Sequence, residues 1–337
     1  MEHSSWDNVT YHAMVVSEEE GTFVRNIETR TLKDLPEGNV LIRVGFSSLN
    51  WKDCLSAMGN PGVTRSYPHT PGIDAAGIVA DCTTETFHKG DKVIVTGYDL
   101  GMNTAGGFAE FIRVPEEWVV RLPEGLTRKE AMMLGTAGFT AGLSAKRLVD
   151  LGVTPEMGTV LVTGATGGVG SLAVLILKKL GFTVAAVSGR EERRDYLSSI
   201  GVDEVVPLDD AVDKSGKPLG KQLWAGVVDA VGGEVLETAI KNTCHRGVVT
   251  CCGNVRSGDL SSSIYPFILR GISLCGIDSA TCPMDERVAV WAKLAVDWKP
   301  ENLAEVVESL NGLEDLDAQM ERMVKGERTG RCVVHIP

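Results

Sequence analysis

Apolar residues recur along the chain in two different rhythms, and the rhythm changes near residue 130. Before that point, short apolar runs alternate with Gly, Pro and Asp, a pattern typical of strands joined by tight turns. The runs cover residues 13–16, 40–46, 77–80, 92–96 and 108–114. This half of the pattern predicts a small, barrel-like β domain.

From residue 128 onward, helical patterns alternate with apolar strands, which predicts a parallel, doubly wound α/β sheet. The expected strands cover residues 159–163, 183–187, 205–207, 226–229, 248–252 and 274–277, with a polar surface loop at 209–220. A helix near 284–298 and a strand at 332–336 break this rhythm, so we expect the tail to return to the first domain. The predicted domains are 1–132 with 276–337, and 133–275. A ligand cleft between two such domains is expected.

Composition narrows the possible partners. The chain has 337 residues, of which 43% are hydrophobic, so it can bury two cores, and its net charge of -12 disfavours nucleic acid and anionic membranes as partners. Its eight cysteines are scattered without C-x-x-C pairs, as in a protein of the reducing cytoplasm. No signal-like or membrane-spanning apolar run is found, so we expect a cytoplasmic protein.

A glycine-rich turn follows the strand at 159–163. Glycines at 164, 167, 168 and 170 let the backbone turn tightly and approach a pyrophosphate at the start of the next helix. That helix carries apolar residues at 172, 175, 176 and 180, one face of a helix packed on a sheet. A glycine pattern alone also fits a flexible turn, but the strand, turn and helix together indicate a dinucleotide site.

The next strand ends in Ser188-Gly189-Arg190, where NAD-specific proteins usually place an acidic residue on the ribose. A serine hydroxyl and an arginine instead suit a 2′-phosphate, which indicates NADPH. The alternative is that Arg190, Arg193 and Arg194 form only the solvated start of a helix.

Two further segments carry candidate site residues. Asn50, Lys52 and Asp53 directly follow an apolar strand, so they either face a ligand or cap a helix, with Lys52 then paired to Asp53. Thr136 and Thr140 lie in a small, hydroxyl-bearing segment that suits either a flat ring or helix packing. Asp74, set before an apolar strand, is interpreted as a structural residue.

The metal-binding residue types form no site pattern. The six histidines show no H-x-x-H or H-E pair, and no cysteine cluster has the spacing of structural zinc, so we expect no zinc. The vicinal pair at 251–252 ends a strand and is interpreted as core rather than as a redox pair.

Several motifs in order resemble the medium-chain dehydrogenase/reductase superfamily, in its zinc-free, quinone-oxidoreductase-like branch, and more narrowly the acrylyl-CoA reductase family. The resemblance spans nearly the whole chain and implies a GroES-like β domain beside a Rossmann domain. The motifs are SSLNWKD at 47–53, PGIDAAG at 71–77, GTAGFTA at 135–141, VTGATGGVGS at 162–171, VSGR at 187–190, PFILRGISLCGIDS at 266–279 and Gly330-Arg331. Where zinc enzymes of the superfamily have G-H-E, this chain has Gly-Ile-Asp at 72–74.

The resemblance implies a set of cofactor-binding residues and a homodimer. The segment 167–170 would hold the pyrophosphate, and Ser188 and Arg190 the 2′-phosphate. The full set is Trp51, Thr136, Thr140, Thr166, Gly167, Gly168, Val169, Gly170, Ser188, Gly189, Arg190, Asn254, Arg270 and Ser279. Trp51 stands where family members often have Tyr, and Thr104-Ala105 departs from the family loop, which puts a substrate contact there in doubt. The first dozen residues look like an extension outside the family core.

The resemblance also implies a reaction, the NADPH-dependent reduction of a 2-enoyl-CoA such as acryloyl-CoA. Asn50, Lys52 and Arg331 would then donate to the negative charge that builds on the thioester oxygen, and Lys52 or a water would supply the proton. Arg270 and Arg331 could instead form surface ion pairs. An NADPH:quinone oxidoreductase and a non-catalytic NADPH sensor remain the alternatives.

Overall fold

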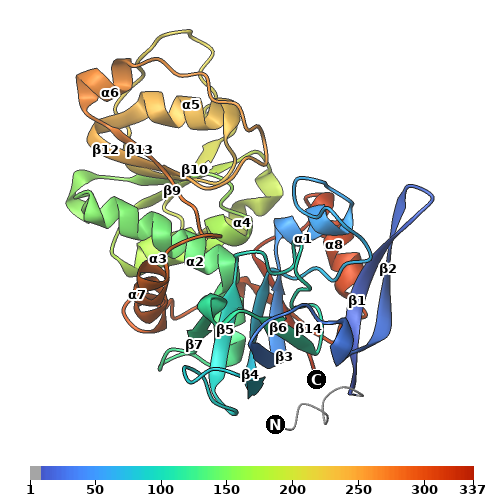
Figure 1. The fold of residues 1–337 in the computed structure, drawn as a ribbon. Helices are drawn as coiled ribbons and strands as arrows, with labels where there is room; N and C mark the ends of the chain where they lie inside the picture. Colours follow the sequence, from blue (N-terminus) through green and yellow to red (C-terminus); the bar gives the residue numbers. More distant parts are fainter. Residues whose placement is uncertain (1–8) are drawn as a thin grey trace. The chain divides into compact units, whose positions relative to one another are not determined.

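The computed structural model describes residues 9–337, which form two compact units (Figure 1). The first unit contains the chain up to Thr136 together with Ala280–Ala292 and Val307–Pro337. The second contains Ala137–Ser279 and Lys293–Val306. The sequence places all of 276–337 in the first domain, whereas Lys293–Val306 belongs to the second unit, where Lys179 Nζ lies 2.8 Å from a Glu301 carboxylate oxygen.

The first unit is built on a seven-stranded sheet in which β14-β15-β3-β4-β5-β7 lie in that order and β6 pairs with β3. All of its pairs are antiparallel except β14 with β15. The strands are β3 (Val40–Leu49), β4 (Asp74–Cys82), β5 (Lys92–Thr96), β6 (Phe111–Val114), β7 (Val119–Arg121), β14 (Val307–Asn311) and β15 (Arg331–His335). Its inward residues form the larger apolar core of the unit.

A long hairpin of β1 (Thr10–Glu19) and β2 (Thr22–Thr31) stands beside this sheet (Figure 1). Of the dozen N-terminal residues expected to be an extension, 1–8 lie outside the described residues. Residues 9–12 are part of the folded first unit, because β1 begins at Thr10 and the His12 backbone N–H donates to the Glu110 carboxylate at 2.9 Å.

The first unit contains the helices α1 (Trp51–Ala57) and α8 (Leu316–Val324) and most of α7 (Met284–Ala295). It also contains the beginning of α2. Helix α7 is anchored by Arg287, which has no exposed surface and donates to the carbonyls of Thr96 (2.8 Å) and Ala280 (3.1 Å). Helix α2 (Arg128–Asp150) is interrupted at Gly135, whose φ of 54° and ψ of -158° lie outside the helical region.

The second unit is the doubly wound sheet expected from the sequence, which is thereby confirmed. Six parallel strands lie in the order β10-β9-β8-β11-β12-β13. They are β8 (Val160–Val162), β9 (Val184–Ser188), β10 (Glu204–Pro207), β11 (Trp224–Asp229), β12 (Thr243–Cys251) and β13 (Ser273–Gly276). Besides the part of α2 that follows Thr136, the α-helices lying wholly in this unit are α3 (Gly168–Lys179), α4 (Arg194–Ser199), α5 (Gly233–Asn242) and α6 (Tyr265–Arg270).

The strand order reverses direction at β8, with β9 on one side of it and β11 on the other. In open α/β sheets, ligands bind at the carboxyl ends of the strands beside such a reversal. None of the helices among residues 9–337 is long and apolar enough to cross a membrane.

Candidate functional site

The glycine-rich turn lies at this point, between the end of β8 and the start of α3. Gly164 has a φ of +61°, and a Cβ on Gly170 would lie 2.2 Å from the Gly164 carbonyl oxygen, so both positions require glycine. Gly167 is the N-cap of α3, and Thr166, Gly168 and Val169 complete the half-buried turn. The first amides of α3 have no partner inside the helix, which leaves them available to an anion.

Thr163 and Asp229 form a buried pair next to the glycine-rich turn, which the sequence pattern had not indicated. The Thr163 hydroxyl donates to the Asp229 carboxylate at 2.6 Å and accepts the Ala230 amide at 3.1 Å, while the carboxylate also accepts the Gly232 amide at 2.9 Å. Thr163 and Asp229 have no exposed surface. Burial raises the pKa of Asp229, and the bonds from Thr163 and Gly232 oppose that shift. The pair ties β8 to β11 beneath the glycine turn.

The candidate 2′-phosphate residues lie at the end of β9. The Ser188 hydroxyl donates to the Arg190 carbonyl at 3.1 Å and accepts the Arg190 amide at 3.3 Å, which forms a compact turn. Arg190 is exposed, and Gly189 packs against Leu208. Arg194 is held by both carboxylate oxygens of Glu191. Ser188 and the exposed Arg190 thus lie together at the carboxyl end of β9.

Asn254 and Ser279 follow β12 and β13, so they share the carboxyl edge of the sheet with the glycine turn and with Ser188. Arg270 does not. Its guanidinium donates to the carbonyls of Gly220 (2.5 Å), Lys241 (2.7 Å) and Thr243 (2.9 Å). Thr243 begins β12, so these contacts lie at the opposite, amino edge. The expectation that Arg270 contacts the cofactor is therefore contradicted. Its guanidinium instead bonds to three backbone carbonyls at the amino edge of the sheet.

In the first unit, Asn50 ends β3 and is the N-cap of α1. The backbone N–H of Asn50 donates to Asp53 Oδ2 at 2.7 Å. Asp53 Oδ1 accepts the backbone N–H groups of Ile73 (2.8 Å) and Gly72 (3.2 Å). The Asp53 carboxylate therefore caps the start of α1 and does not pair with Lys52. Burial and the charge of Asp74 raise the pKa of Asp53 from 3.8 to about 7, against the effect of the three amide donors.

Asp74 is the acceptor at the centre of a buried polar cluster. It accepts Ser48 Oγ at 2.6 Å, Asn50 Nδ2 at 2.8 Å, and both the hydroxyl (2.5 Å) and the amide (2.9 Å) of Thr136. A Cβ on Gly135 would lie 2.5 Å from the same carboxylate. The interruption of α2 at Gly135 thus lets the Thr136 amide reach Asp74, which agrees with the structural interpretation of Asp74.

Arg331 completes this cluster and is 2% exposed. It donates to the Ser48 hydroxyl (2.8 Å), the Asn50 side-chain oxygen (3.0 Å) and the carbonyls of Leu49 and Met133 (both 3.2 Å). Burial lowers the pKa of Arg331, and the charge of Asp74 opposes that shift. With its donors committed inside the protein, Arg331 is a positioning residue, which contradicts a direct contact with substrate.

Lys52 and Trp51 differ from this cluster because they lie at the accessible start of α1. Trp51 is 37% exposed, and Lys52 is half-buried and forms no hydrogen bond or ion pair with any residue from 9 to 337. Asn50 is 9% exposed and its amide is already bonded to Ser48, Asp74 and Arg331. Of the three expected catalytic residues, Lys52 alone keeps its polar group available for a ligand.

Thr140, an expected cofactor residue, is buried in the second unit, and its carbonyl accepts Ser144 Oγ at 2.9 Å.

Comparison with known proteins agrees with this architecture. The family model described as alcohol dehydrogenase GroES-like domain matches residues 36–124, and the one described as zinc-binding dehydrogenase matches 168–295. The acrylyl-CoA reductase AcuI of Ruegeria pomeroyi is 41% identical over 97% of this chain and 99% of its own length. The chain belongs to the medium-chain dehydrogenase/reductase superfamily.

Two further members of the superfamily are similar over nearly the whole chain. YhfP of Bacillus subtilis, whose name assigns it provisionally to the quinone oxidoreductases, is 44% identical over 92% of this chain and 94% of its own. Its structure, solved with NAD bound, has a TM-score of 0.95. The yhdH oxidoreductase of Salmonella enterica, solved with NADP, is 40% identical, covers 97% of this chain and 100% of its own, and has a TM-score of 0.94.

The zinc named in one family description does not fit the residues of this superfamily member. Among residues 9–337, no group of three or more His, Cys, Asp or Glu side chains is arranged to hold a metal ion. The acidic residue of the Gly-Ile-Asp motif, Asp74, is surrounded by hydroxyl, amide and guanidinium donors rather than by other ligands. No step of the reaction is assigned to a metal.

Proposed function

We propose that the protein reduces the carbon–carbon double bond of a 2-enoyl-CoA with NADPH, with acryloyl-CoA as substrate and propanoyl-CoA as product. The observation that carries this proposal is the 41% identity to the acrylyl-CoA reductase AcuI over 97% of the chain. The match spans 97% of this chain and 99% of the relative, so both units of the chain take part in it.

NADPH is the proposed coenzyme. Its pyrophosphate would lie at the first amides of α3, and its 2′-phosphate would take the Ser188 hydroxyl and the exposed Arg190 guanidinium. The NADP-bound relative supports this assignment. YhfP was solved with NAD, so the preference of this chain for NADPH over NADH is a separate point that binding measurements decide.

When bound, NADPH supplies the hydride, which adds to the β-carbon of the thioester. The chain must then stabilise the negative charge on the thioester oxygen and deliver a proton to the α-carbon. Lys52 is proposed for the first task, and Lys52 or a water for the second. Asn50 and Arg331 act indirectly, since they fix the start of the helix that carries Trp51 and Lys52.

A second candidate function is NADPH:quinone oxidoreduction, which the 44% identity to YhfP favours. The discriminating experiment compares kcat/KM for acryloyl-CoA and for 1,4-benzoquinone, each with NADPH, by following the absorbance of the reduced nicotinamide. A higher value for acryloyl-CoA supports the proposal, and a higher value for the quinone replaces it. If the protein binds NADPH but reduces neither acceptor, the result would favour the third alternative, a non-catalytic NADPH sensor.

We further propose a homodimer. Strand β13 is an edge of the six-stranded sheet. Helix α6, which precedes it in the chain, exposes Ile268 (63%) and Leu269 (59%), and the N-cap of α6, Ile264, is 65% exposed. An unpaired strand edge with adjoining apolar side chains is a surface that a second copy can cover about a two-fold axis.

A further inference from the structure

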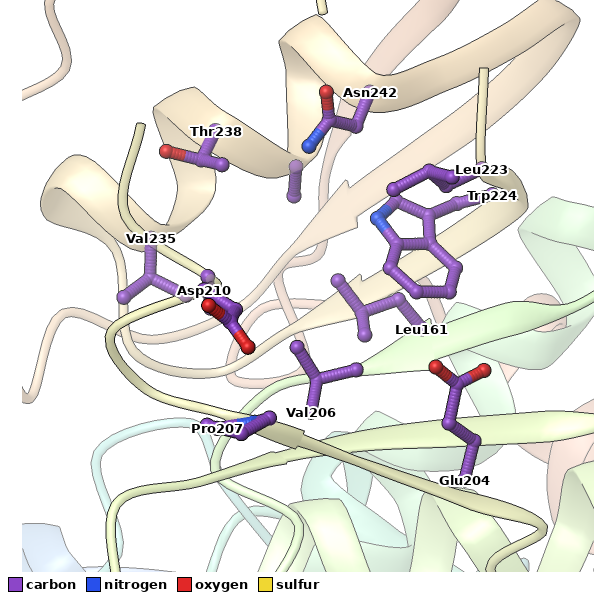
Figure 2. A pocket seen from close by; sticks show the side chains of 12 residues that line it. Leu161, Glu204, Val206, Pro207, Asp210, Leu223, Trp224, Val235, Thr238 and Asn242 are labelled. Carbon is purple, nitrogen blue, oxygen red and sulfur yellow. The ribbon is translucent and has the colours of Figure 1, made fainter. Parts of the chain in front are cut away.

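The second unit contains a cavity of about 200 Å³ that the proposed function does not use. It lies between helix α5 and strands β8, β10 and β11 (Figure 2). Most of its wall is apolar, with Leu161, Val206 and Val235 among the lining residues. The segment between β10 and β11 forms no helix, and its residues Asp210 and Ala211 line the cavity.

Trp224 supplies a hydrogen-bond donor that nothing in the protein uses. The side chain is 7% exposed, and its indole N–H has no acceptor among residues 9–337. Figure 2 shows the indole nitrogen on the cavity side of the ring. A tryptophan that packs inside a protein normally places its indole N–H against an acceptor, either in the protein or on a molecule beside it. The unpaired donor therefore points to an acceptor on a molecule inside the cavity.

The polar groups around this donor limit the charge of that molecule. The Asn242 side-chain amide also lines the cavity, and it forms no hydrogen bond within the described chain. Glu204 and Asp210 line it as well, both exposed, and neither is paired with a cation of residues 9–337. Two carboxylates repel an anion, whereas they accept hydrogen bonds from a neutral amide or a protonated amine.

We propose that this cavity binds a small, largely apolar molecule that carries no negative charge and presents a hydrogen-bond acceptor to the indole N–H of Trp224. Its volume is below the roughly 300–1,000 Å³ typical of sites for drug-sized ligands, so the molecule is about the size of a single substituted ring. None of the lining residues belongs to the proposed coenzyme set. The site therefore stands independently of the proposed function.

Benzamide is a suitable probe because it has an apolar ring, a carbonyl acceptor and an amide donor. Benzoate has the same size but is an anion, and toluene lacks the acceptor. Binding of each to the full-length protein is measured by isothermal titration calorimetry with and without saturating NADPH. We expect benzamide to bind with an affinity that NADPH does not change, benzoate not to bind, and toluene to bind more weakly. No binding of benzamide, equal binding of benzoate, or competition with NADPH would overturn the proposal.

Two variants locate the probe. Trp224→Phe keeps an aromatic ring and removes the N–H, so we expect benzamide affinity to fall about 2- to 10-fold, the effect of one lost hydrogen bond. Ala211→Leu adds bulk from the loop that lines the cavity, and we expect it to abolish binding even if Trp224→Phe does not fold. Trp118→Phe, which alters a tryptophan outside the cavity, is the matched control and should bind normally. Unchanged affinity in both cavity variants would contradict the assignment.

Discussion

Ser48 connects Arg331 to Asp74 in the interior of the first unit: its hydroxyl donates to the carboxylate at 2.6 Å and accepts from the guanidinium at 2.8 Å. The two charged groups themselves lie 3.7 Å apart and have 2% and 0% exposed side-chain surface. A charge pair at this depth is costly to break, because removing one partner leaves the other buried and uncompensated.

Arg331→Met is therefore expected to lower the free energy of unfolding by about 3–5 kcal/mol, the usual effect of breaking a buried pair. Urea unfolding followed by circular dichroism measures this. Arg322→Met is the matched control, since Arg322 forms an exposed ion pair with Glu308, and we expect it to cost less than about 1 kcal/mol. Equal losses in the two variants would mean that the buried cluster contributes no more than a surface pair.

Asp53 should make stability depend on pH. Its pKa in the folded protein is raised from 3.8 to about 7, so the folded state binds a proton more tightly than the unfolded state. Its contribution to stability is therefore complete below the unfolded pKa and declines as pH rises toward about 7. We expect Asp53→Asn to flatten the decline in urea midpoint across that window, whereas Asp195→Asn, at an exposed site, should leave it. An identical slope in wild type and Asp53→Asn would refute the raised pKa.

Lys52→Met should slow turnover of acryloyl-CoA by about 10-fold or more, because one electrostatic or acid role is lost. Affinity for NADPH, measured by fluorescence titration, should be unchanged. Lys129→Met removes an exposed lysine elsewhere in the first unit and should have no effect. Normal turnover by Lys52→Met would remove Lys52 from the mechanism.

Arg190→Ala should weaken NADPH by about 10- to 100-fold, which corresponds to the roughly 1.5–3 kcal/mol of a hydrogen bond to a charged group. NADH, which has no 2′-phosphate, should be affected far less. Arg194→Ala is the control, because Arg194 is already held by Glu191. Equal weakening of both coenzymes would show that Arg190 supports the loop and does not bind the phosphate.

The homodimer can be tested at α6. Ile268→Glu places a charge in the exposed apolar surface beside β13, and we expect it to yield monomers in light scattering coupled to size-exclusion chromatography. Val288→Glu, at another exposed apolar position, should leave the oligomeric state unchanged. A wild-type monomer, or a dimer that Ile268→Glu does not alter, would exclude this surface.

Apolar periodicity located strands that carry a continuous apolar run, and missed strands whose sequences are short or polar. The expected strand at 92–96 matches β5, whose residues after Lys92 are all buried. Strand β2 was missed because its sequence, TFVRNIETRT, is largely polar, and it lies in an exposed hairpin. Strand β12 begins at Thr243, five residues before the expected start at 248, because Thr243–Gly247 is mostly polar. The hairpin strand β2 and the polar start of β12 are held by backbone pairing, which leaves little apolar signal.

The candidate site shows a similar limit. Local patterns located the glycine turn and the Ser188-Gly189-Arg190 end of β9, because each is formed by consecutive residues. Arg331 contacts Asp74, Ser48 and Met133, which are distant from it in sequence. From the sequence alone the arginine was therefore interpreted as a ligand contact. Arg270 and the Thr163–Asp229 pair were misjudged or missed for the same reason. The cytoplasmic location expected from the cysteines stays a prediction.

The most direct test of the proposed reaction is the position of isotope in its product. NADPH carrying deuterium at the transferred C4 position is incubated with acryloyl-CoA and the protein, and the propanoyl-CoA is analysed by NMR. The account predicts one deuterium on C3, the former β-carbon, with the hydrogen added at C2 coming from solvent. Deuterium at C2, or oxidation of NADPH without labelled propanoyl-CoA, would contradict it.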